Sequence, residues 1–229
     1  MPQRTCVITG ASRGIGLATA RRFAAKGFAI VGAARHEAEL AKALEQIGTE
    51  VHPVLADVAV PQDLEGLIAT AVERFGRVDV LVNNAGRAPL APIESLAPDE
   101  FDRVTAVNMT AVYRATRAVW PHMLAQGGGV IVNISSLSSV DPFPGLGVYG
   151  ASKAWVNLFS RAMAAEGKGH GIRVYAVAPG AVRTQMLRSL FPEIPAAQTL
   201  DPDEVAAVIE SACDPSLAPV SGETLFVRK

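Results

Sequence analysis

The sequence has only two cysteines, almost no net charge and no long apolar segment, and each of these absences excludes a class of protein. Cys6 and Cys213 lie near opposite ends of the 229 residues, and so sparse a pair cannot form a disulfide framework. The 21 basic and 22 acidic side chains give a formal net charge of -1, which provides no field to attract nucleic acid or an anionic membrane. A small neutral or weakly charged ligand is therefore the expected partner.

No apolar run approaches the roughly 20 residues that a membrane-spanning helix needs. The first residues pass directly into the apolar run at 5–9, without the apolar segment and cleavage site of a secretory signal peptide. Two sparse thiols suit a reducing compartment, and Cys6 falls inside an apolar run where packing is its expected role. These features predict a cytoplasmic protein.

The chain does contain a regular alternation of short apolar runs with longer, alanine-rich stretches of helical period. The runs that predict strands are residues 4–9, 29–34, 51–55, 79–83, 130–134, 172–178 and 224–227. The stretches that predict helices are residues 14–26, 37–47, 61–75, 99–126 and 149–168, with a short helix opening at Pro202. Residues 183–200 are expected to be irregular. Strands that alternate with helices predict βαβ units, and no repeat or linker divides the chain, so we expect one doubly wound α/β domain.

A glycine-rich turn follows the first predicted strand and opens the first predicted helix. Residues 9–16 read Thr-Gly-Ala-Ser-Arg-Gly-Ile-Gly. Gly10 would let the chain reverse, Gly14 would let backbone approach a pyrophosphate, and Gly16 would let helix and strand pack closely. The helix N-terminus would then face the phosphates with its free N–H groups. This glycine spacing is weak by itself, and a tight turn without a ligand accounts for it equally well.

The most specific signal is Tyr149 followed four residues later by Lys153 at the start of a predicted helix. This spacing puts the phenol and the ammonium one turn apart on the same helix face. A phenol has an unperturbed pKa of about 10, and a neighbouring cation lowers that pKa by favouring the phenolate. The pair therefore predicts an acid or base, and a chance pair on a solvated face is the alternative.

Other residues suited to binding stand just beyond predicted strands, where a doubly wound sheet has its ligand crevice. They are Ser136, the Asn-Asn-Ala-Gly run at 83–86 and the Pro-Gly pair at 179–180. Each alone is more simply explained as a turn. Position alone does not distinguish the Ser136 hydroxyl from three others in the same loop, those of Ser135, Ser138 and Ser139. The convergence of these strand ends at one edge of the sheet nevertheless favours a functional site.

Together these motifs resemble the short-chain dehydrogenase/reductase family. The resemblance runs from residue 5 to residue 227 and also includes an Asp-Val pair at 57–58, Asn108, and the run Pro-Gly-Ala-Val-Arg-Thr at 179–184. It implies a single domain with a doubly wound (Rossmann-type), seven-stranded parallel sheet in the order 3-2-1-4-5-6-7 and helices on both faces. It also implies a cofactor-binding half at about 1–130, a catalytic and substrate-binding half at about 131–229, and a homodimer or homotetramer.

The resemblance implies roles for individual residues and selects Ser136 among the serines. Tyr149 would be the general acid in carbonyl reduction and the general base in alcohol oxidation. Lys153 would lower the pKa of Tyr149 and hold the nicotinamide ribose, and Ser136 would hydrogen-bond the substrate oxygen. Asn108 would hold a water that links Lys153 to solvent, unless it merely satisfies a helix bend. The further cofactor contacts that the resemblance implies are Gly10, Ser12, Arg13, Gly14, Ile15, Gly16, Arg35, Asp57, Val58, Asn84, Ala85, Gly86, Pro179, Gly180, Val182 and Thr184, and no metal site is expected.

These expectations describe an oxidoreductase that moves a hydride between a nicotinamide cofactor and a carbonyl or secondary alcohol. NADP(H) is expected over NAD(H), because Ala34 stands where NAD-binding relatives usually carry an acidic residue. Arg13 and Arg35 could then converge on a 2′-phosphate, with two solvated surface arginines as the alternative. The alternative functions are a dehydratase or epimerase on the same fold and a cofactor-binding regulator without turnover.

The substrate is not identified by the sequence. Its specificity is expected to reside in residues 137–148 and 186–195, and residues 186–200 are expected to form a mobile lid over the site.

Overall fold

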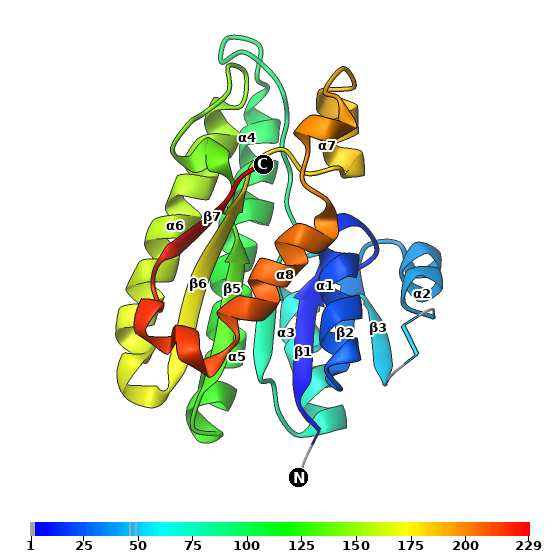
Figure 1. Cartoon of the computed structure of the whole chain (residues 1–229), viewed down its shortest axis with the longest axis vertical. Helices are drawn as coiled ribbons and strands as arrows, with labels where there is room; N and C mark the ends of the chain where they lie inside the picture. Colours follow the sequence, from blue (N-terminus) through cyan, green and yellow to red (C-terminus); the bar gives the residue numbers. More distant parts are fainter. Residues whose placement is uncertain (1–2, 46, 49) are drawn as a thin grey trace.

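The computed structural model describes residues 3–45, 47–48 and 50–229. Its centre is a seven-stranded, fully parallel sheet in the order β3-β2-β1-β4-β5-β6-β7 (Figure 1), which confirms the predicted fold and strand order. The strands are β1 (Thr5–Thr9), β2 (Ala29–Ala34), β3 (Val51–Leu55), β4 (Val80–Asn83), β5 (Gly129–Ile134), β6 (Ile172–Pro179) and β7 (Thr224–Val227). The strand order reverses between β1 and β4, and a doubly wound sheet opens its ligand crevice at such a point.

Helices cover both faces of the sheet. They are α1 (Gly14–Ala25), α2 (Glu37–Glu45), α3 (Pro61–Phe75), α4 (Pro98–Thr105), α5 (Ala111–Ala125), α6 (Gly147–Gly167), α7 (Gln185–Leu190) and α8 (Pro202–Ala212). Apolar residues of α1, α2 and α8 pack on one face of the sheet, and those of α3, α5 and α6 pack on the other. No helix in the described part of the chain is both long and apolar enough to span a membrane.

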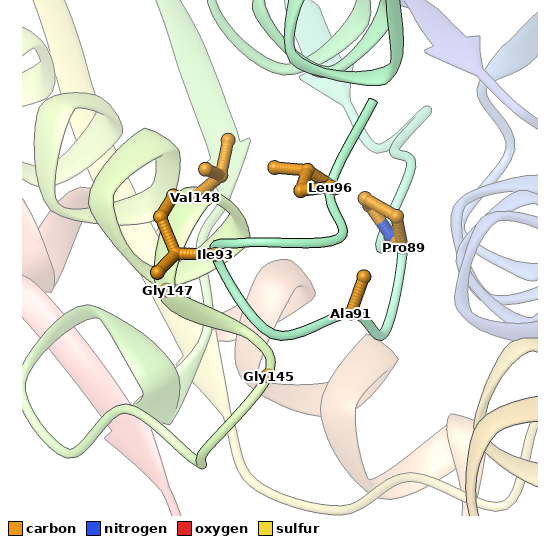
Figure 2. A pocket seen from close by; sticks show the side chains of 7 residues that line it. All are labelled: Pro89, Ala91, Ile93, Leu96, Gly145, Gly147 and Val148. Atoms are coloured by element: carbon orange, nitrogen blue, oxygen red, sulfur yellow. The ribbon is translucent and has the colours of Figure 1, made fainter. Parts of the chain in front are cut away.

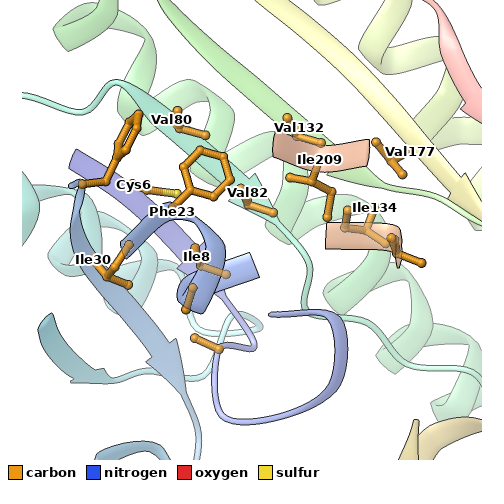
Figure 3. Close-up of a cluster of buried hydrophobic side chains, with 14 of the residues drawn as sticks. Cys6, Ile8, Phe23, Ile30, Val80, Val82, Val132, Ile134, Val177 and Ile209 are labelled. Atoms are coloured by element: carbon orange, nitrogen blue, oxygen red, sulfur yellow. The ribbon is translucent and has the colours of Figure 1, made fainter. Parts of the chain in front are cut away.

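Successive residues of the central strands supply the two cores in turn. In β1, Cys6 and Ile8 point into the core beneath α1 and α8, whereas Val7 points into the opposite core. Figure 3 shows the first of these cores, with Cys6 and Phe23 among its buried side chains. Because both faces of a parallel sheet are covered, its strands appear in the sequence as continuous apolar runs.

The long helix predicted at 99–126 forms over residues 98–125, but it is not α-helical throughout. The structure divides it into α4, a π-helical turn at Ala106–Thr110, and α5. Asn108 lies inside this turn with its side chain fully buried. A π-turn adds one residue to a helix, so it changes the direction in which the following side chains point. Here it turns the Asn108 amide inward, toward α6.

Most other boundaries lie within two residues of the prediction, and two segments show a further difference. The helix predicted at 37–47 ends as α2 at Glu45; residue 46 lies outside the described residues, and Ile47 lies in a turn. The segment predicted to be irregular at 183–200 contains α7. This helix begins after Thr184, whose Oγ1 accepts a hydrogen bond of 3.2 Å from the N–H of Leu187. A threonine N-cap is a local helix signal that the two prolines of this segment obscured.

Candidate active site

The glycine turn between β1 and α1 has a shape that only glycine adopts readily. Gly10 and Gly14 have φ angles of 68° and 55°, in the left-handed region. A Cβ at Gly16 would lie 2.2 Å from the carbonyl oxygen of Gly10, so no larger residue allows α1 to approach β1 this closely. Among the described residues, no side chain caps α1 and no acidic side chain stands in its first turn. The N–H groups at this helix end therefore fit a pyrophosphate.

Asn84 joins the ends of β1 and β4 where the strand order reverses. Its Nδ2 donates hydrogen bonds to the carbonyl oxygens of Thr9 and Gly10 at 2.9 and 3.0 Å. The hydroxyl of Thr9 in turn accepts hydrogen bonds of 3.0 Å from the N–H groups of Asn84 and Ala85. The Nδ2 of Asn84 therefore stabilises the glycine turn itself.

Tyr149, Ser136 and Lys153 come together between the end of β5 and the start of α6. The side chain of Ser136, the second residue after β5, is close enough to the phenol of Tyr149 to influence its pKa. The Nζ of Lys153 lies 5.7 Å from the centre of the Tyr149 ring and donates a hydrogen bond of 2.7 Å to the carbonyl oxygen of Ile134. The predicted Tyr149 and Lys153 pair thus shares one helix face, with Ser136 opposite.

The electrostatics of this pair differ from the sequence-based expectation. Burial raises the pKa of Tyr149, and the interaction with the Ser136 side chain opposes this rise without overcoming it. Lys153, only 4% exposed, has its pKa lowered by burial to about 8. The ammonium is directed at a backbone carbonyl, so in this structure desolvation governs the phenol and keeps it protonated.

The neighbouring serines have structural partners. Ser135 donates a hydrogen bond of 3.1 Å to the carbonyl oxygen of Lys153, and Ser139 accepts one of 2.9 Å from Asn157. Ser136 also accepts a hydrogen bond of 3.2 Å from the N–H of Ser138, at the start of a 3-10 turn. Of the four loop serines, Ser136 is the one that contacts the phenol.

Asn108 holds the loop after β4 against α6. Its Oδ1 accepts a hydrogen bond from the N–H of Arg87, and its Nδ2 donates to the carbonyl oxygen of Arg87 and to the hydroxyl of Ser152, each at 2.9 Å. Gly86 lies beside this contact, and a Cβ there would be 3.7 Å from both the Oδ1 of Asn108 and the Nζ of Lys153. The side chain of Asn108 therefore joins the loop after β4 to α6, close to Lys153.

The ion pair between Arg87 and Glu100 was not among the features predicted from the sequence. The guanidinium of Arg87 donates two-pronged hydrogen bonds of 2.6 to 3.0 Å to the Glu100 carboxylate, and Arg103 donates another of 2.7 Å. The hydrogen bond from Arg87 is the main reason that the pKa of Glu100 is lowered. The only local signal was an arginine next to Gly86 and an acidic residue in a helix first turn, and neither reveals the pairing.

The run at 179–184 crosses from the end of β6 to the glycine turn. Gly180 donates a hydrogen bond of 2.9 Å to the carbonyl oxygen of Val227, and buried Val182 bridges to Leu200. Thr184 then lies over the turn, since a Cβ at Gly14 would be 3.2 Å from its methyl group. These backbone contacts bring both ends of the predicted cofactor site together.

The remaining predicted cofactor residues lie around the ends of α1, β2 and β3. Arg13 is half exposed; it donates a hydrogen bond of 2.8 Å to Gln185 and lies 3.9 Å from the carboxylate of Glu39. Arg35 is exposed just after β2, and Ser12 is partly buried. The side chains of three of these residues make contacts within the fold. Asp57 accepts a hydrogen bond from the N–H of Ala59, Val58 is buried in one core, and Ile15 packs against the other.

An apolar cavity of about 250 Å³ lies beside the start of α6 (Figure 2). Its lining residues are Pro89, Ala91, Ile93, Leu96, Gly145, Gly147 and Val148. The segment 137–148, where specificity was expected, supplies three of them, whereas 186–195 supplies none. The other wall, formed by the loop between β4 and α4, was not predicted from the sequence. Its apolar, proline-containing composition directly after the Asn-Asn-Ala-Gly run was the available signal.

Comparison with known proteins agrees with this geometry. Residues 4–195 match the family model described as short chain dehydrogenase. The chain is 37% identical to 3beta-hydroxysteroid dehydrogenase 1 of Eggerthella lenta, over 98% of this chain and 92% of that protein. It superimposes with a TM-score of 0.92 at 34% identity on a 3-ketoacyl-(acyl-carrier-protein) reductase from Brucella melitensis complexed with NADH, covering 98% and 96% of the two chains. A single-substitution variant of actinorhodin polyketide ketoreductase with NADPH gives a TM-score of 0.93 at 34% identity, covering 99% and 96%.

The family match, the similarity over nearly the whole chain and the shared fold point to one conclusion. This chain belongs to the short-chain dehydrogenase/reductase family and is an NAD(P)-dependent dehydrogenase or reductase.

Proposed function

We propose that this enzyme interconverts a ketone or aldehyde and the corresponding alcohol with NADP(H), using Tyr149 as the general acid and base. The observation that carries the proposal is the partly buried phenol of Tyr149, which interacts with Ser136 and lies one helical turn from Lys153. The raised pKa keeps the phenol protonated at neutral pH, which is the state that a proton donor to a carbonyl oxygen requires.

Ser136 and Lys153 would assist Tyr149 in different ways. The Ser136 hydroxyl would donate a hydrogen bond to the substrate oxygen while negative charge develops on it. Lys153 would hold the ribose hydroxyls. Because burial lowers its pKa to about 8, it would also exchange a proton readily near neutral pH and resupply the phenol. Asn108 would position Lys153 through Ser152 and the backbone of Arg87. The nicotinamide supplies the hydride when bound.

The crevice around this centre fits a dinucleotide. The glycine turn offers uncapped N–H groups, and Gly86 leaves space beside the Nζ of Lys153 that a larger side chain would fill. The other contacts proposed are those expected from the sequence: Gly10, Ser12, Arg13, Gly14, Ile15, Gly16, Arg35, Asp57, Val58, Asn84, Ala85, Pro179, Gly180, Val182 and Thr184.

Preference for the phosphorylated cofactor rests on Arg13 and Arg35. Ala34 leaves no carboxylate at the end of β2, and both arginines are exposed near it, where each can pair with phosphate oxygens. Glu39 is the competing group, because its carboxylate is 3.9 Å from Arg13. A 2′-phosphate, which carries more charge than a carboxylate and accepts two-pronged hydrogen bonds, would displace this exposed and weak pairing.

We also propose that residues 1–229 act as one domain, with a cofactor half at about 1–130 and a catalytic half at about 131–229. The continuous sheet supports this, since β4 and β5 on either side of the division are hydrogen-bonded to each other. A homodimer or homotetramer in the cytoplasm remains our expectation and is testable by light scattering and fractionation.

The test is cofactor oxidation across a panel of ketones and aldehydes, with NADPH and NADH compared by kcat/KM. Product analysis separates reduction from elimination or epimerisation, and no turnover on any carbonyl would favour a cofactor-binding regulator. The double variant Arg13→Ala, Arg35→Ala should lose the preference for NADPH while Arg161→Ala, Arg183→Ala retains it. Equal use of both cofactors by the wild type, or an unchanged preference in the variant, contradicts the NADP(H) assignment.

A further inference from the structure

We infer that the apolar cavity between residues 89–96 and 145–148 receives the hydrocarbon part of the substrate, so that this enzyme prefers hydrophobic, uncharged ketones and secondary alcohols. The inference rests on the proposed function, because it assigns a substrate class to the same site. One wall of this cavity is formed by residues 89–96 of the loop between β4 and α4. None of these residues has a role in the catalysis proposed above.

The cavity lies between two segments that lead directly into the proposed catalytic centre. Gly147 and Val148 on one side immediately precede Tyr149 on α6. Pro89 on the other side is three residues after Gly86, which borders the Nζ of Lys153 and the Oδ1 of Asn108. Both walls of the cavity are therefore continuous in the chain with residues that border the proposed catalytic centre.

The chemistry of the lining excludes a charged occupant. All seven lining residues are glycine, alanine, proline or aliphatic, so they offer no side chain that can form a hydrogen bond (Figure 2). The nearest cation along the loop is Arg87, and its guanidinium is already paired with the Glu100 carboxylate through two of its N–H groups. A carboxylate or phosphate in the cavity would lose its hydration without gaining a partner, which is costly.

The two walls are held in place, so the cavity is part of the folded chain. The N–H of Ala91 donates a hydrogen bond of 3.0 Å to the carbonyl oxygen of Gly145. Gly145 has a φ of +83°, and a Cβ there would lie 2.9 Å from Leu90. The loop after β4 is thereby joined to the loop before α6 by a contact that needs glycine.

Exposed apolar side chains continue from the cavity onto the surrounding loops. Ile93 is 79% exposed at its wall, and Phe143 is 55% exposed on the opposite loop. Phe143 packs edge to face on Phe191, at 4.9 Å between ring centres, which extends the apolar surface to the segment after α7. A contiguous group of exposed apolar side chains around a cavity is typical of a ligand-binding surface.

The size of the cavity sets the length of the occupant. An apolar cavity of about 150 Å³ holds a benzene ring, and whole drug-sized ligands occupy about 300–1,000 Å³. A cavity of about 250 Å³ therefore takes part of a substrate, on the order of six to eight carbon atoms.

The first experiment measures kcat/KM for the methyl ketones from 2-butanone to 2-octanone, and for 7-oxooctanoate, which has the length of 2-octanone but ends in a carboxylate. We expect a rise of about fourfold for each added methylene. We expect 7-oxooctanoate to fall at least about tenfold below 2-octanone, because its charge would be desolvated. A flat series, or a keto acid as good as 2-octanone, overturns the inference.

The second experiment fills the cavity. Ala91→Phe keeps the backbone hydrogen bond to Gly145 and should abolish the gain in kcat/KM from 2-hexanone to 2-octanone. Ala97→Phe is the matched control, since Ala97 lies on the same loop but outside the lining. If Ala91→Phe retains the wild-type dependence on chain length, the occupant lies elsewhere.

A binding measurement separates this inference from the proposed function. Calorimetry with 2-octanone and NADP⁺, a pair that cannot react with each other, should give a dissociation constant roughly 250-fold below that of 2-butanone, about fourfold for each of the added methylenes. Ala91→Phe should remove the part of this difference that lies between 2-hexanone and 2-octanone. Tight binding of 2-octanone without turnover of any ketone would refute the proposed function and leave the apolar subsite supported; turnover without a chain-length effect would refute the subsite alone.

Discussion

The ammonium of Lys153 donates a hydrogen bond of 2.7 Å to the carbonyl oxygen of Ile134, the last residue of β5. This bond ties the first turns of α6 to the edge of the sheet at which the proposed chemistry takes place. It also explains why Lys153 tolerates burial: one proton has a backbone acceptor, while the loss of solvent lowers the pKa to about 8.

Lys153→Met should change how stability depends on pH. Lys153 has a pKa of about 8 in the folded protein and 10.5 as an unperturbed group, so between these values the unfolded chain binds more protons than the folded one. The unfolding free energy of the wild type should therefore rise relative to that of the variant as the pH increases from 8 to 10.5, by up to about 3 kcal/mol.

Urea denaturation of both proteins at closely spaced pH values measures this difference. Burial raises the pKa values of Cys6 and Cys213. These thiols therefore lower stability above about pH 9, but they do so in both proteins and cancel. Lys168→Met, at an exposed site, is the control and should show no such trend. A wild-type to Lys153→Met difference that stays constant across the window would contradict the lowered pKa.

Tyr149→Phe should abolish turnover and leave cofactor binding nearly unchanged. The substitution removes one proton donor and keeps the ring, and general acid-base groups contribute about 10²- to 10⁴-fold in rate. Steady-state kinetics and a cofactor titration test both parts. Tyr113→Phe on the exposed face of α5 should match the wild type. Retention of more than about a tenth of the activity would remove Tyr149 from its proposed role.

Gly16→Ala and Gly66→Ala should change stability in opposite directions. At Gly16 the new Cβ would meet the backbone oxygen of Gly10 at 2.2 Å, so the chain must shift, at a cost of about 1–3 kcal/mol in unfolding free energy. At Gly66, inside α3, nothing lies within 4 Å of the new Cβ, and alanine should stabilise the helix by about 1 kcal/mol. Chemical denaturation checks both. The Gly16 variant should also bind cofactor more weakly, and normal binding there would contradict the role of the turn.

Residues 186–200 should exchange amide hydrogens more slowly when cofactor and ketone are bound. No residue of α7 is buried. The hydrogen bond from Arg13 to Gln185 holds the residue before the segment, and buried Leu200, which bridges to Val182, holds its end. Between these two points, Phe191 contacts Phe143. Segments with few buried contacts open readily and are stabilised when a ligand covers them. Hydrogen exchange by mass spectrometry tests this, and equally slow exchange with and without ligands would argue for a rigid surface loop.

Much of the fold and some of the site were predictable because they depend on local patterns. The bounds of β2, β3, β7 and α3 match the prediction residue for residue, since apolar runs and an N-terminal proline determine them within a few residues. The glycine turn and the four-residue spacing of Tyr149 and Lys153 are equally local. Each reflects a backbone shape or a helix period that neighbouring residues impose.

What remained unpredictable depends on groups brought together from distant parts of the chain. The π-turn at Asn108 is stabilised by contacts with Arg87 and Ser152, which are 21 and 44 residues away. The wall at 89–96 becomes a cavity only when it meets Gly145 across the crevice. The sequence determined that Tyr149 and Lys153 would share a helix face. Only the tertiary structure decided their pKa values, because the loss of solvent depends on every element packed around them.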